Sequence, residues 1–555
     1  MNKEEYRNLF EKDFLWINGF MRNVKRFPQK CALQQAETGK AWTYEELNKE
    51  ANRMANSMAT GGFKKEDCIM YALYNSPQFI ICHLAAHKLS GVSTPINYNW
   101  APQEIAYVME DSKPKVFVYD SEIAHLVAQA LELSSYKPET VLYVEQENLD
   151  SFSEGDSAGG EEVPGQRMEL YMVAGGDSEP ERQESSTYDE TVRLYTSGTT
   201  GRPKGVPLSD LNEILSAHDV AMHFPLNETD TTLNMTPWFH RGGLHSGGPT
   251  PSLYVGAKVV SMRKFNPKFC SDYMEEYGVS FLIGAPSVLK FLSRQQKRSP
   301  RNFATLKGII TMGSPLEKAD CIEFMDVLTP NLFNGYGTTE TFWNTFLRPW
   351  QLPEMSGSAG RSCIFDDVYV VKAYEDRKAE PDELVSMDGK EVGEVIIKSS
   401  GKMSYSYHNN PAAEEKKYYK GYLYTGDLAT WDEECFITIA GRKDDMIICS
   451  GENIYPVQIE EAFMEHPAVK DIIVSGVADE IRGQAVVAYI IPEGEPPKVS
   501  ELIDFASEHR DLSTFKRPRF YRFVEELPYT ATGKKMHYKV KQMAEEDKKK
   551  GILLR

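Results

Sequence analysis

The feature that most constrains this fold is a glycine-rich stretch, YTSGTTGRPKG, which spans residues 195–205. A strand-like run leads into it and ends at Tyr195. A helix is expected from about Asp210, whose carboxylate would cap it, with Glu213 three residues on. Its apolar face would be formed by Leu211, Ile214 and Leu215. The pattern therefore predicts a tight loop between a strand and a helix.

The composition of this loop suits phosphate binding. Its glycines let the backbone approach a ligand closely, and its hydroxyls and ammonium can donate to phosphate oxygens. The donors are Ser197, Thr199, Thr200 and Lys204, and the glycines are Gly198, Gly201 and Gly205. The spacing differs from a Walker A loop because a glycine, Gly205, follows the lysine directly. A polar surface turn is the simpler reading, but so many donors and glycines together favour a phosphate loop.

Short apolar runs alternate with helical patterns along most of the chain. Strands are expected at 68–73, 116–119, 192–195, 259–261 and 280–283, and a helix begins after Thr43, with Glu46 completing a capping box. Later the pattern changes to helix 456–465, strands 471–476 and 485–491, and helix 499–509. These patterns predict an α/β fold with mixed, largely parallel sheets flanked by helices. A large N-terminal part of several subdomains, 1–443, would precede a small mobile α+β domain, 444–555.

One segment departs from this alternation. Residues 150–190 are acidic and rich in Gly, Ser and Pro, which predicts an exposed connection or insertion. Within it, the run MELYMV at 168–173 has the composition of a short strand. The function of this segment is not indicated by its residues.

Composition and charge limit the partners and the compartment. The net charge of −19 argues against an extended nucleic-acid surface, which needs clustered Lys and Arg. The eight cysteines show no CxxC spacing, so a reducing compartment is expected and a zinc site of the usual cysteine spacing is not. No apolar run is long enough to span a bilayer, and the first residues do not resemble a signal peptide. We expect a cytoplasmic monomer or homodimer without stable membrane insertion.

Several separate motifs resemble those of the AMP-forming acyl-CoA synthetases, relatives of luciferases and of peptide-synthetase adenylation domains. YTSGTTGRPKG is nearly the phosphate-loop signature of that family. The other motifs recur in the family's order: PWFHRGG at 237–243, NGYGTTE at 334–340, YTGDL at 424–428, GRKDD at 441–445 and LPYTATGK at 527–534. The resemblance extends from about Trp42 to about Lys539. It implies activation of a carboxylic acid with ATP and Mg²⁺.

The resemblance also implies roles in the nucleotide site. Tyr336 would stack on adenine, Thr339 would contact the α-phosphate, and Glu340 would help to hold Mg²⁺, which favours carboxylates and phosphate oxygens. Asp427 would accept hydrogen bonds from both ribose hydroxyls, since an ionised carboxylate only accepts. The implied ATP and AMP contacts are Thr196, Ser197, Gly198, Thr199, Thr200, Gly201, Lys204, Gly313, Ser314, Pro315, Asn334, Gly335, Tyr336, Gly337, Asp427 and Arg442.

The C-terminal motifs would supply a catalytic lysine and a moving domain. By resemblance, Lys534 bridges the incoming carboxylate and the α-phosphate while the adenylate forms, and its neighbour Lys535 is treated as solvated. Asp444 would be the pivot of the domain rotation, within a charged segment that also reads as an exposed linker. Ser450 and Gly451 would line the tunnel for the thiol arm of coenzyme A, although a glycine there equally suits a simple turn.

The acid-binding pocket is less well defined. By resemblance, His240 is the gate beside the reacting carboxylate, with packing in the core as its alternative. The other implied pocket residues are Trp238, Arg241, Ala285, Met312, Gly313 and Gly337. The acetate-specific branch of the family has a tryptophan where this chain has Gly337-Thr338, which argues against acetate unless Trp238 fills that space. Arg241 would pair with a second substrate carboxylate or with a neighbouring acid.

These motifs together predict a carboxylic acid–CoA ligase, with coenzyme A as co-substrate and a small carboxylate larger than acetate as substrate. Medium-chain fatty, aryl and alicyclic acids remain alternatives. A stand-alone enzyme that loads a carrier protein and a luciferase-like oxidative enzyme share the same adenylation chemistry. From another class, a catalytically silent nucleotide-binding protein is disfavoured because Glu340 and Lys534 are both present.

Overall fold

The computed structural model describes residues 1–145, 163–196, 202–374, 376–449, 452–479, 482–509, 512, 514, 516–529 and 534–555. The chain forms two compact units. The first contains residues 1–357, 362–367 and 398–421, and the second contains residues 358–361, 368–397 and 422–555. The predicted boundary at 443–444 stays a prediction, because this grouping follows contacts and not the hinge motif.

The phosphate-loop motif belongs to a seven-stranded sheet of the first unit. Its strands, in spatial order, are β7 (Gln166–Arg167), β6 (Thr140–Val144), β5 (Val116–Asp120), β3 (Cys68–Ala72), β4 (Val92–Pro95), β8 (Glu190–Thr196) and β9 (Lys204–Ser209). Neighbours are parallel as far as β8, and β9 pairs antiparallel with β8. Strands β3 and β5 are buried on both faces, as expected in the middle of a parallel sheet covered by helices.

A nine-stranded sheet carries most of the remaining first-unit motifs. Its order is β16 (Arg361–Ser362), β15 (Phe342–Leu347), β14 (Leu332–Thr338), β13 (Gly308–Met312), β12 (Phe281–Gly284), β10 (Thr231–Asn234), β11 (Lys258–Ser261), β1 (Cys31–Gln35) and β2 (Ala41–Thr43). From β14 to β1 all neighbours are parallel. The carboxyl ends of β10, β12, β13 and β14 therefore lie at one edge of the sheet.

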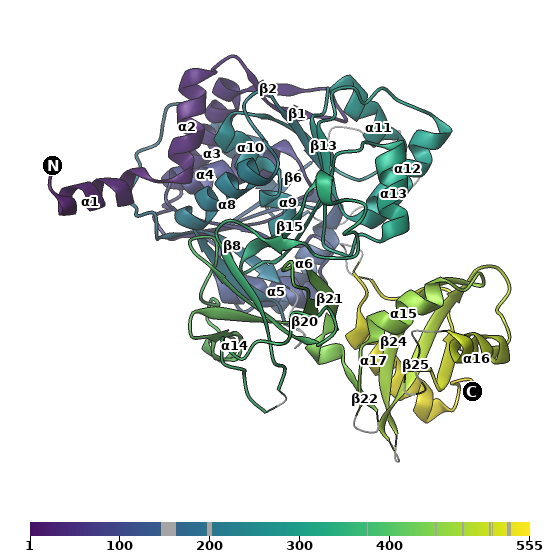
Figure 1. The fold of residues 1–555 in the computed structure, drawn as a ribbon. Helices are drawn as coiled ribbons and strands as arrows, with labels where there is room; N and C mark the ends of the chain where they lie inside the picture. The colour runs from purple at the N-terminus through teal and green to yellow at the C-terminus, as the bar shows by residue number, and fades with distance from the viewer. Residues whose placement is uncertain are drawn as a thin grey trace. The chain divides into compact units, whose positions relative to one another are not determined.

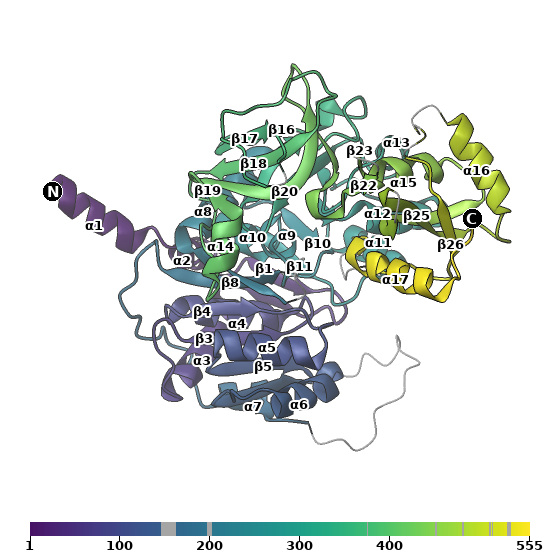
Figure 2. The ribbon, with the colours of Figure 1, turned by 90° about the horizontal axis from the view of Figure 1, so that it is seen from below.

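Helices flank both sheets (Figures 1 and 2). The helices of the first unit are α1 (Lys3–Asp13), which buries no residue and projects away from the sheets, and α2 (Trp16–Arg26), α3 (Tyr44–Thr60), α4 (Pro77–Lys88), α5 (Pro102–Ser112), α6 (Ala124–Leu133), α7 (Met168–Val173), α8 (Asp210–His223), α9 (Arg241–His245), α10 (Pro249–Val255), α11 (Pro267–Glu276), α12 (Pro286–Arg298), α13 (Lys318–Val327) and α14 (Pro411–Lys417). Helix α4 is buried along almost its whole length, so its polar residues lie inside the protein.

Two smaller sheets follow; most of their residues belong to the second unit, and residues 366–367, 398–399 and 418–419 belong to the first. One has the order β17 (Asp366–Val371), β18 (Gly393–Ser399), β20 (Tyr422–Trp431) and β19 (Tyr418–Tyr419), with β21 (Ile437–Arg442) also paired to β20. The other has the order β23 (Glu452–Ile454), β22 (Ile447–Cys449), β25 (Gly483–Pro492) and β24 (Val469–Asp479), with β26 (Phe520–Phe523) beside β25. Its helices are α15 (Pro456–Met464), α16 (Val499–Glu508) and α17 (His537–Lys550).

The predicted fold class is confirmed, and so are most elements named from the sequence. Thr43 caps α3, with both hydrogen bonds of the capping box to Glu46 present. Two local predictions were wrong. The run 168–173 is helix α7, whose buried Met168 and Met172 are one helical turn apart and so face the core together. The cap of α8 is Ser209 and not Asp210, because the Asp210 carboxylate is buried and accepts from the Trp16 N–H at 2.7 Å.

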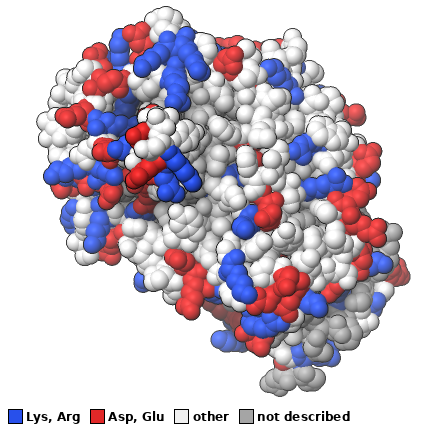
Figure 3. All heavy atoms as spheres, turned by 60° about the vertical axis from the view of Figure 1, so that its left-hand side comes forward, with Lys and Arg blue, Asp and Glu red and all other residues white. Residues whose placement is uncertain are grey.

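Charge and hydropathy add two observations. Acidic and basic side chains are interspersed over most of the face shown in Figure 3. Within the described ranges, no helix combines the length and the apolar character that crossing a membrane requires.

Candidate active site

The phosphate-loop motif lies at the turn between β8 and β9. In the register of this hairpin Thr196 lies opposite Lys204, so the strands hold the two ends of the loop together. Strand β9 separates the loop from α8, which the sequence did not indicate. The Lys204 ammonium lies 5.8 Å from the centroid of the Tyr407 ring. Residues 197–201 lie outside the described residues, so their phosphate contacts stay predictions.

The turn after β14 holds the predicted metal ligand. Oε1 of Glu340 accepts a hydrogen bond from the Tyr407 hydroxyl at 2.5 Å. The backbone carbonyl of Glu340 accepts from the Ser404 N–H at 2.7 Å. The carboxylate is half-buried, so a cation can still reach it. This carboxylate donor set fits Mg²⁺, which binds one or two carboxylates together with phosphate oxygens and water.

Arg241 fixes the same turn from inside the protein. Its guanidinium is 3% exposed and donates to the carbonyl of Thr339 at 2.6 Å and to that of Lys402 at 2.8 Å. It also donates to the Ser216 hydroxyl at 3.2 Å. Burial lowers the pKa of Arg241 to about 10, opposed by the charges of Glu213 and Glu340. Arg241 thus bridges two backbone carbonyls. The sequence predicted a carboxylate partner for it and did not indicate this role.

Gly337 is required by the backbone of the nucleotide motif. The ladder between β14 and β15 shifts register at Tyr336 and Gly337. A Cβ at Gly337 would lie 1.6 Å from the Phe342 carbonyl oxygen, so no side chain is tolerated. The tryptophan of the acetate-specific branch could not occupy this position without changing the strand. Earlier in β14, the Asn334 side chain accepts from the buried Thr311 hydroxyl at 2.7 Å.

The predicted pocket residues gather at the carboxyl edge of the nine-stranded sheet. His240 follows β10 and caps α9, Ala285 follows β12 and caps α12, and Gly313 follows β13 with a positive φ of 89°. The segments involved are 237–241, 284–286, 312–315 and 334–340, which include Met312, Ser314, Pro315, Gly335 and Tyr336. Ligands of α/β sheets bind at this edge.

Trp238 and Met312 contribute packing to this region. Trp238 is 1% exposed, and its ring packs edge-on against Phe79 with centroids 5.5 Å apart. Its backbone N–H donates to the Asn75 side chain at 2.8 Å. The sulfur of Met312 would be 2.7 Å from a Cβ at Gly242, so that glycine gives Met312 its place. Whether these residues contact an acid stays a prediction.

The second unit carries the other nucleotide motifs. Asp427 on β20 faces Arg442 on β21 in register, and their side chains form an ion pair at 2.5 Å. Next to it, Lys443 pairs with Glu394 at 2.9 Å. Asp444 lies in a single 3-10 turn, Lys443–Asp445, directly after β21. The predicted tunnel residues Ser450 and Gly451 lie outside the described residues.

The predicted catalytic lysine lies within the electrostatic reach of that pair. Desolvation lowers the pKa of Lys534 from its ordinary value, Asp427 raises it, and Arg442 lowers it. The Lys534 side chain as a whole is exposed, so this desolvation is local to the ammonium. Lys535 is not solvated as predicted, because it pairs at 2.8 Å with the buried carboxylate of Glu460.

The comparisons with known proteins agree with these motifs. The sequence model described as AMP-binding enzyme matches residues 20–407, and that of the AMP-binding enzyme C-terminal domain matches residues 458–534. The chain belongs to the AMP-binding enzymes. It is 28% identical over 508 residues to a long-chain-fatty-acid–CoA ligase, FadD13 of Mycobacterium tuberculosis, covering 91% of this chain and 94% of that protein.

Two further relatives of this AMP-binding enzyme differ in their acceptor or substrate. A fatty acid–[acyl-carrier-protein] ligase, ScoC of Streptomyces coeruleorubidus, is 26% identical, with 89% of this chain and 90% of that protein covered. The structure of o-succinylbenzoate coenzyme A synthetase from Bacillus subtilis, in complex with ATP and magnesium ion, superimposes with a TM-score of 0.78 at 25% identity. That match covers 94% of this chain and 98% of the other.

Proposed function

We propose that this protein is an ATP-dependent carboxylic acid–CoA ligase. It forms an acyl-adenylate and pyrophosphate, and then an acyl-CoA thioester and AMP. The observation that carries the proposal is the turn at Thr339 and Glu340, which is fixed by hydrogen bonds from Arg241 and Tyr407. Tyr407 also links this turn to the phosphate loop, because the Lys204 ammonium lies near its ring. A nucleotide triphosphate with a bound cation is the ligand that such a turn and loop suit.

The adenylation step needs positive charge at the α-phosphate, because two anions must meet there. Lys204 would bind the outgoing phosphates, and Glu340 would hold Mg²⁺, which neutralises phosphate charge when bound. Asp427 would accept from the ribose hydroxyls, exchanging its present partner Arg442 for the nucleotide. Lys534 would bring its ammonium to the carboxylate and the α-phosphate. Desolvation lowers the pKa of this ammonium, so an anionic partner such as the substrate carboxylate would stabilise its charged form.

The acid is proposed to be larger than acetate. Gly337 cannot carry a side chain, so the pocket is not closed from that position. Similar proteins act on a long-chain fatty acid and on o-succinylbenzoate, which supports an extended or aryl acid for this chain. Coenzyme A as acceptor rests on the resemblance around Gly451. The similarity to ScoC favours transfer to a carrier protein as the second candidate.

The decisive experiment incubates the full-length protein with ATP, Mg²⁺ and a panel of carboxylates, with and without coenzyme A, and identifies the products by mass. We expect AMP, pyrophosphate and an acyl-CoA with at least one extended acid. Acyl-adenylate that accumulates without thioester would favour the carrier-protein function. No AMP release with any acid of the panel would overturn the proposal in favour of a silent nucleotide-binding protein.

A further inference from the structure

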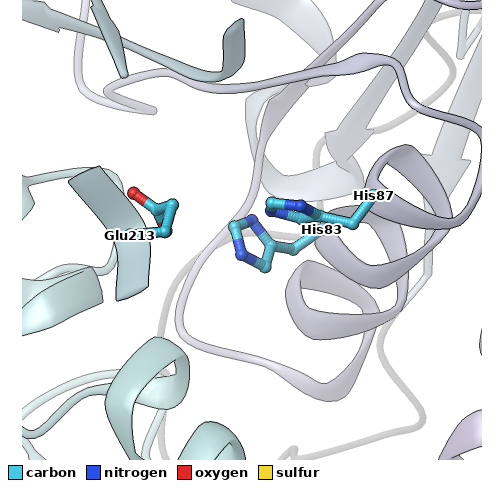
Figure 4. Close-up of side chains that lie close together, drawn as sticks. All are labelled: His83, His87 and Glu213. Carbon is cyan, nitrogen blue, oxygen red and sulfur yellow. The ribbon is translucent and has the colours of Figure 1, made fainter. Parts of the chain in front are cut away.

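Three helices of the first unit enclose a buried group of histidines and acids. His83 and His87 lie one turn apart on α4, Glu213 lies on α8, and His245 lies on α9. Their exposed fractions are 2%, 1%, 0% and 0%, respectively. Figure 4 shows the two imidazoles projecting from α4 toward Glu213. None of the motifs of the nucleotide site includes these residues.

The candidate ligand atoms lie close enough to share one ion. One atom each of His83, His87 and Glu213 lies within 4.8 Å of the others. Metal–ligand bonds of about 2.1 Å allow ligand atoms to be at most about 4.2 Å apart, so small side-chain rotations would complete the site. Two histidines at positions i and i+4 present their rings on the same helix face, which makes such convergence easy.

Several polar atoms of this cluster have no hydrogen-bond partner among the residues that the structure describes. They are Nε2 of His83, both ring nitrogens of His87 and Oε2 of Glu213. Buried polar atoms without partners carry their full desolvation penalty, so such atoms point to a ligand that satisfies them. A single cation would satisfy one nitrogen from each histidine and the carboxylate oxygen at once.

The hydrogen bonds that His83 and Glu213 make leave one atom of each side chain available to bind a metal ion. Nδ1 of His83 lies 3.0 Å from the Ser93 hydroxyl, which leaves Nε2 toward the cluster. Oε1 of Glu213 lies 2.5 Å from Nε2 of His245, which leaves Oε2. Metal ligands are commonly oriented in this way by a second hydrogen bond. Burial also lowers the pKa of His83 to about 4 and that of His87, which keeps both imidazoles neutral.

A second cluster in the same unit shows what a site without a metal looks like. Asp219, His223 and Cys363 also lie within reach of one ion. However, the Lys402 ammonium pairs with Asp219 at 2.8 Å, and the Arg348 guanidinium contacts His223 Nδ1 at 2.7 Å. Cationic side chains already fill the place of a metal there. No Lys or Arg makes a hydrogen bond to His83, His87 or Glu213 within the described ranges.

We propose that His83, His87 and Glu213 bind one divalent transition-metal ion, with Zn²⁺ as the best match. Two imidazoles and a carboxylate are ligands that zinc accepts, and a water would supply the fourth ligand of a tetrahedral site. The site is structural, because its ligands are buried, and it differs from the Mg²⁺ position at Glu340. The ion would tie α4 to α8 and, through His245, to α9, the helix that begins beside His240.

The metal content of the full-length protein tests this directly. We expect close to one zinc per chain by mass spectrometry after gel filtration into metal-free buffer. The double variant His83→Gln/His87→Gln should lose it, whereas His125→Gln, which alters an exposed histidine on α6, should retain it. A wild-type protein without stoichiometric metal, or a double variant that still holds its zinc, would overturn the proposal.

A second measurement remains informative if the double variant does not fold. Chelator-treated wild-type protein is titrated with Co²⁺, whose visible absorption reports a site of nitrogen and oxygen ligands. We expect saturation near one equivalent, displacement by Zn²⁺ but not by Mg²⁺, and loss of the signal in Glu213→Gln. A titration without a saturable band would overturn the proposal.

Discussion

The predicted nucleotide contacts of the two units are held in different ways. In the first unit, the turn at Glu340 is fixed by Arg241, which is 3% exposed, and by the hydroxyl of Tyr407. In the second unit, Asp427 is held by Arg442, whose side chain is 36% exposed. Buried hydrogen bonds to carbonyls hold one geometry, whereas a half-exposed ion pair contributes little and can exchange partners.

This difference separates a preformed turn in the first unit from side chains in the second unit that can exchange partners. The Glu340 turn is in place before any ligand arrives, because its anchors are protein groups that no substrate replaces. Asp427 and Lys534 carry opposite charges within electrostatic reach of each other, so under the proposed function each would change partner when a nucleotide binds. We therefore expect substitutions at the Glu340 turn to weaken the binding of ATP and Mg²⁺. Substitution of Lys534 should instead slow the formation of the adenylate.

The largest effect is expected from Lys534→Ala. Removing a cation from a transition state of this kind costs about 10²–10³ in rate, so adenylate formation should fall by at least that factor. Thioester formation from pre-made acyl-AMP should survive. Pyrophosphate release and thioester formation are measured separately, with Lys539→Ala, an exposed lysine of α17, as control. Equal loss of both half-reactions would contradict the assigned role.

A smaller loss is expected from Arg241→Lys. Lysine keeps the charge but cannot bridge the carbonyls of Thr339 and Lys402 together. Losing charge-assisted hydrogen bonds of about 1.5–3 kcal/mol should lower kcat/KM for ATP about 10- to 100-fold. Arg263→Lys is the matched control, since Arg263 is also buried but pairs with Asp120. If both variants lose only thermal stability, Arg241 has no positioning role.

The residues proposed to contact ligands can be named from the sequence, but the residues that hold them in place cannot. Lys204, Glu340, Asp427 and Lys534 lie in short motifs whose spacing reflects the ligand. Arg241 and Tyr407 act through contacts across 98 and 67 positions of sequence, which no local pattern encodes.

Contacts between residues far apart in the sequence also explain why the capping role predicted for Asp210 was wrong. Caps and alternating strands follow from neighbouring residues, as at Thr43 and along β3. Asp210 was assigned a capping role because acids favour the first turn of a helix. Its burial against Trp16, 194 positions away, depends on how α8 packs. A buried acid and an exposed acid look alike in sequence.

Tyr407→Phe would sharpen the comparison within the first unit. It removes the hydroxyl that donates to Oε1 of Glu340, a loss of about 1 kcal/mol or roughly fivefold. The Mg²⁺ concentration for half-maximal adenylation should rise by that factor, because the carboxylate loses an orienting partner. Tyr418→Phe is the control, since its hydroxyl donates to the Ser404 carbonyl at 2.6 Å and not to Glu340. Equal Mg²⁺ dependence in the two variants would contradict the role of Tyr407.

The smallest effect is expected from His537, which belongs to a buried ion-pair cluster in the second unit. His537 contacts the buried carboxylate of Glu460 at 2.8 Å, and Lys535 pairs with the same carboxylate. Burial lowers the pKa of His537, but Glu460 and Asp445 outweigh it, so the folded pKa is raised from 6.5. This contribution to stability is therefore fully present below pH 6.5 and is lost as the pH rises through the folded value.

His537→Gln should consequently lower the unfolding midpoint of this unit more at pH 6 than at pH 9. The difference corresponds to about 1 kcal/mol, the contribution of one charge-assisted hydrogen bond. Calorimetry at the two pH values measures it, with the exposed His125→Gln variant as control. A loss that is the same at both pH values would mean that His537 acts by packing alone.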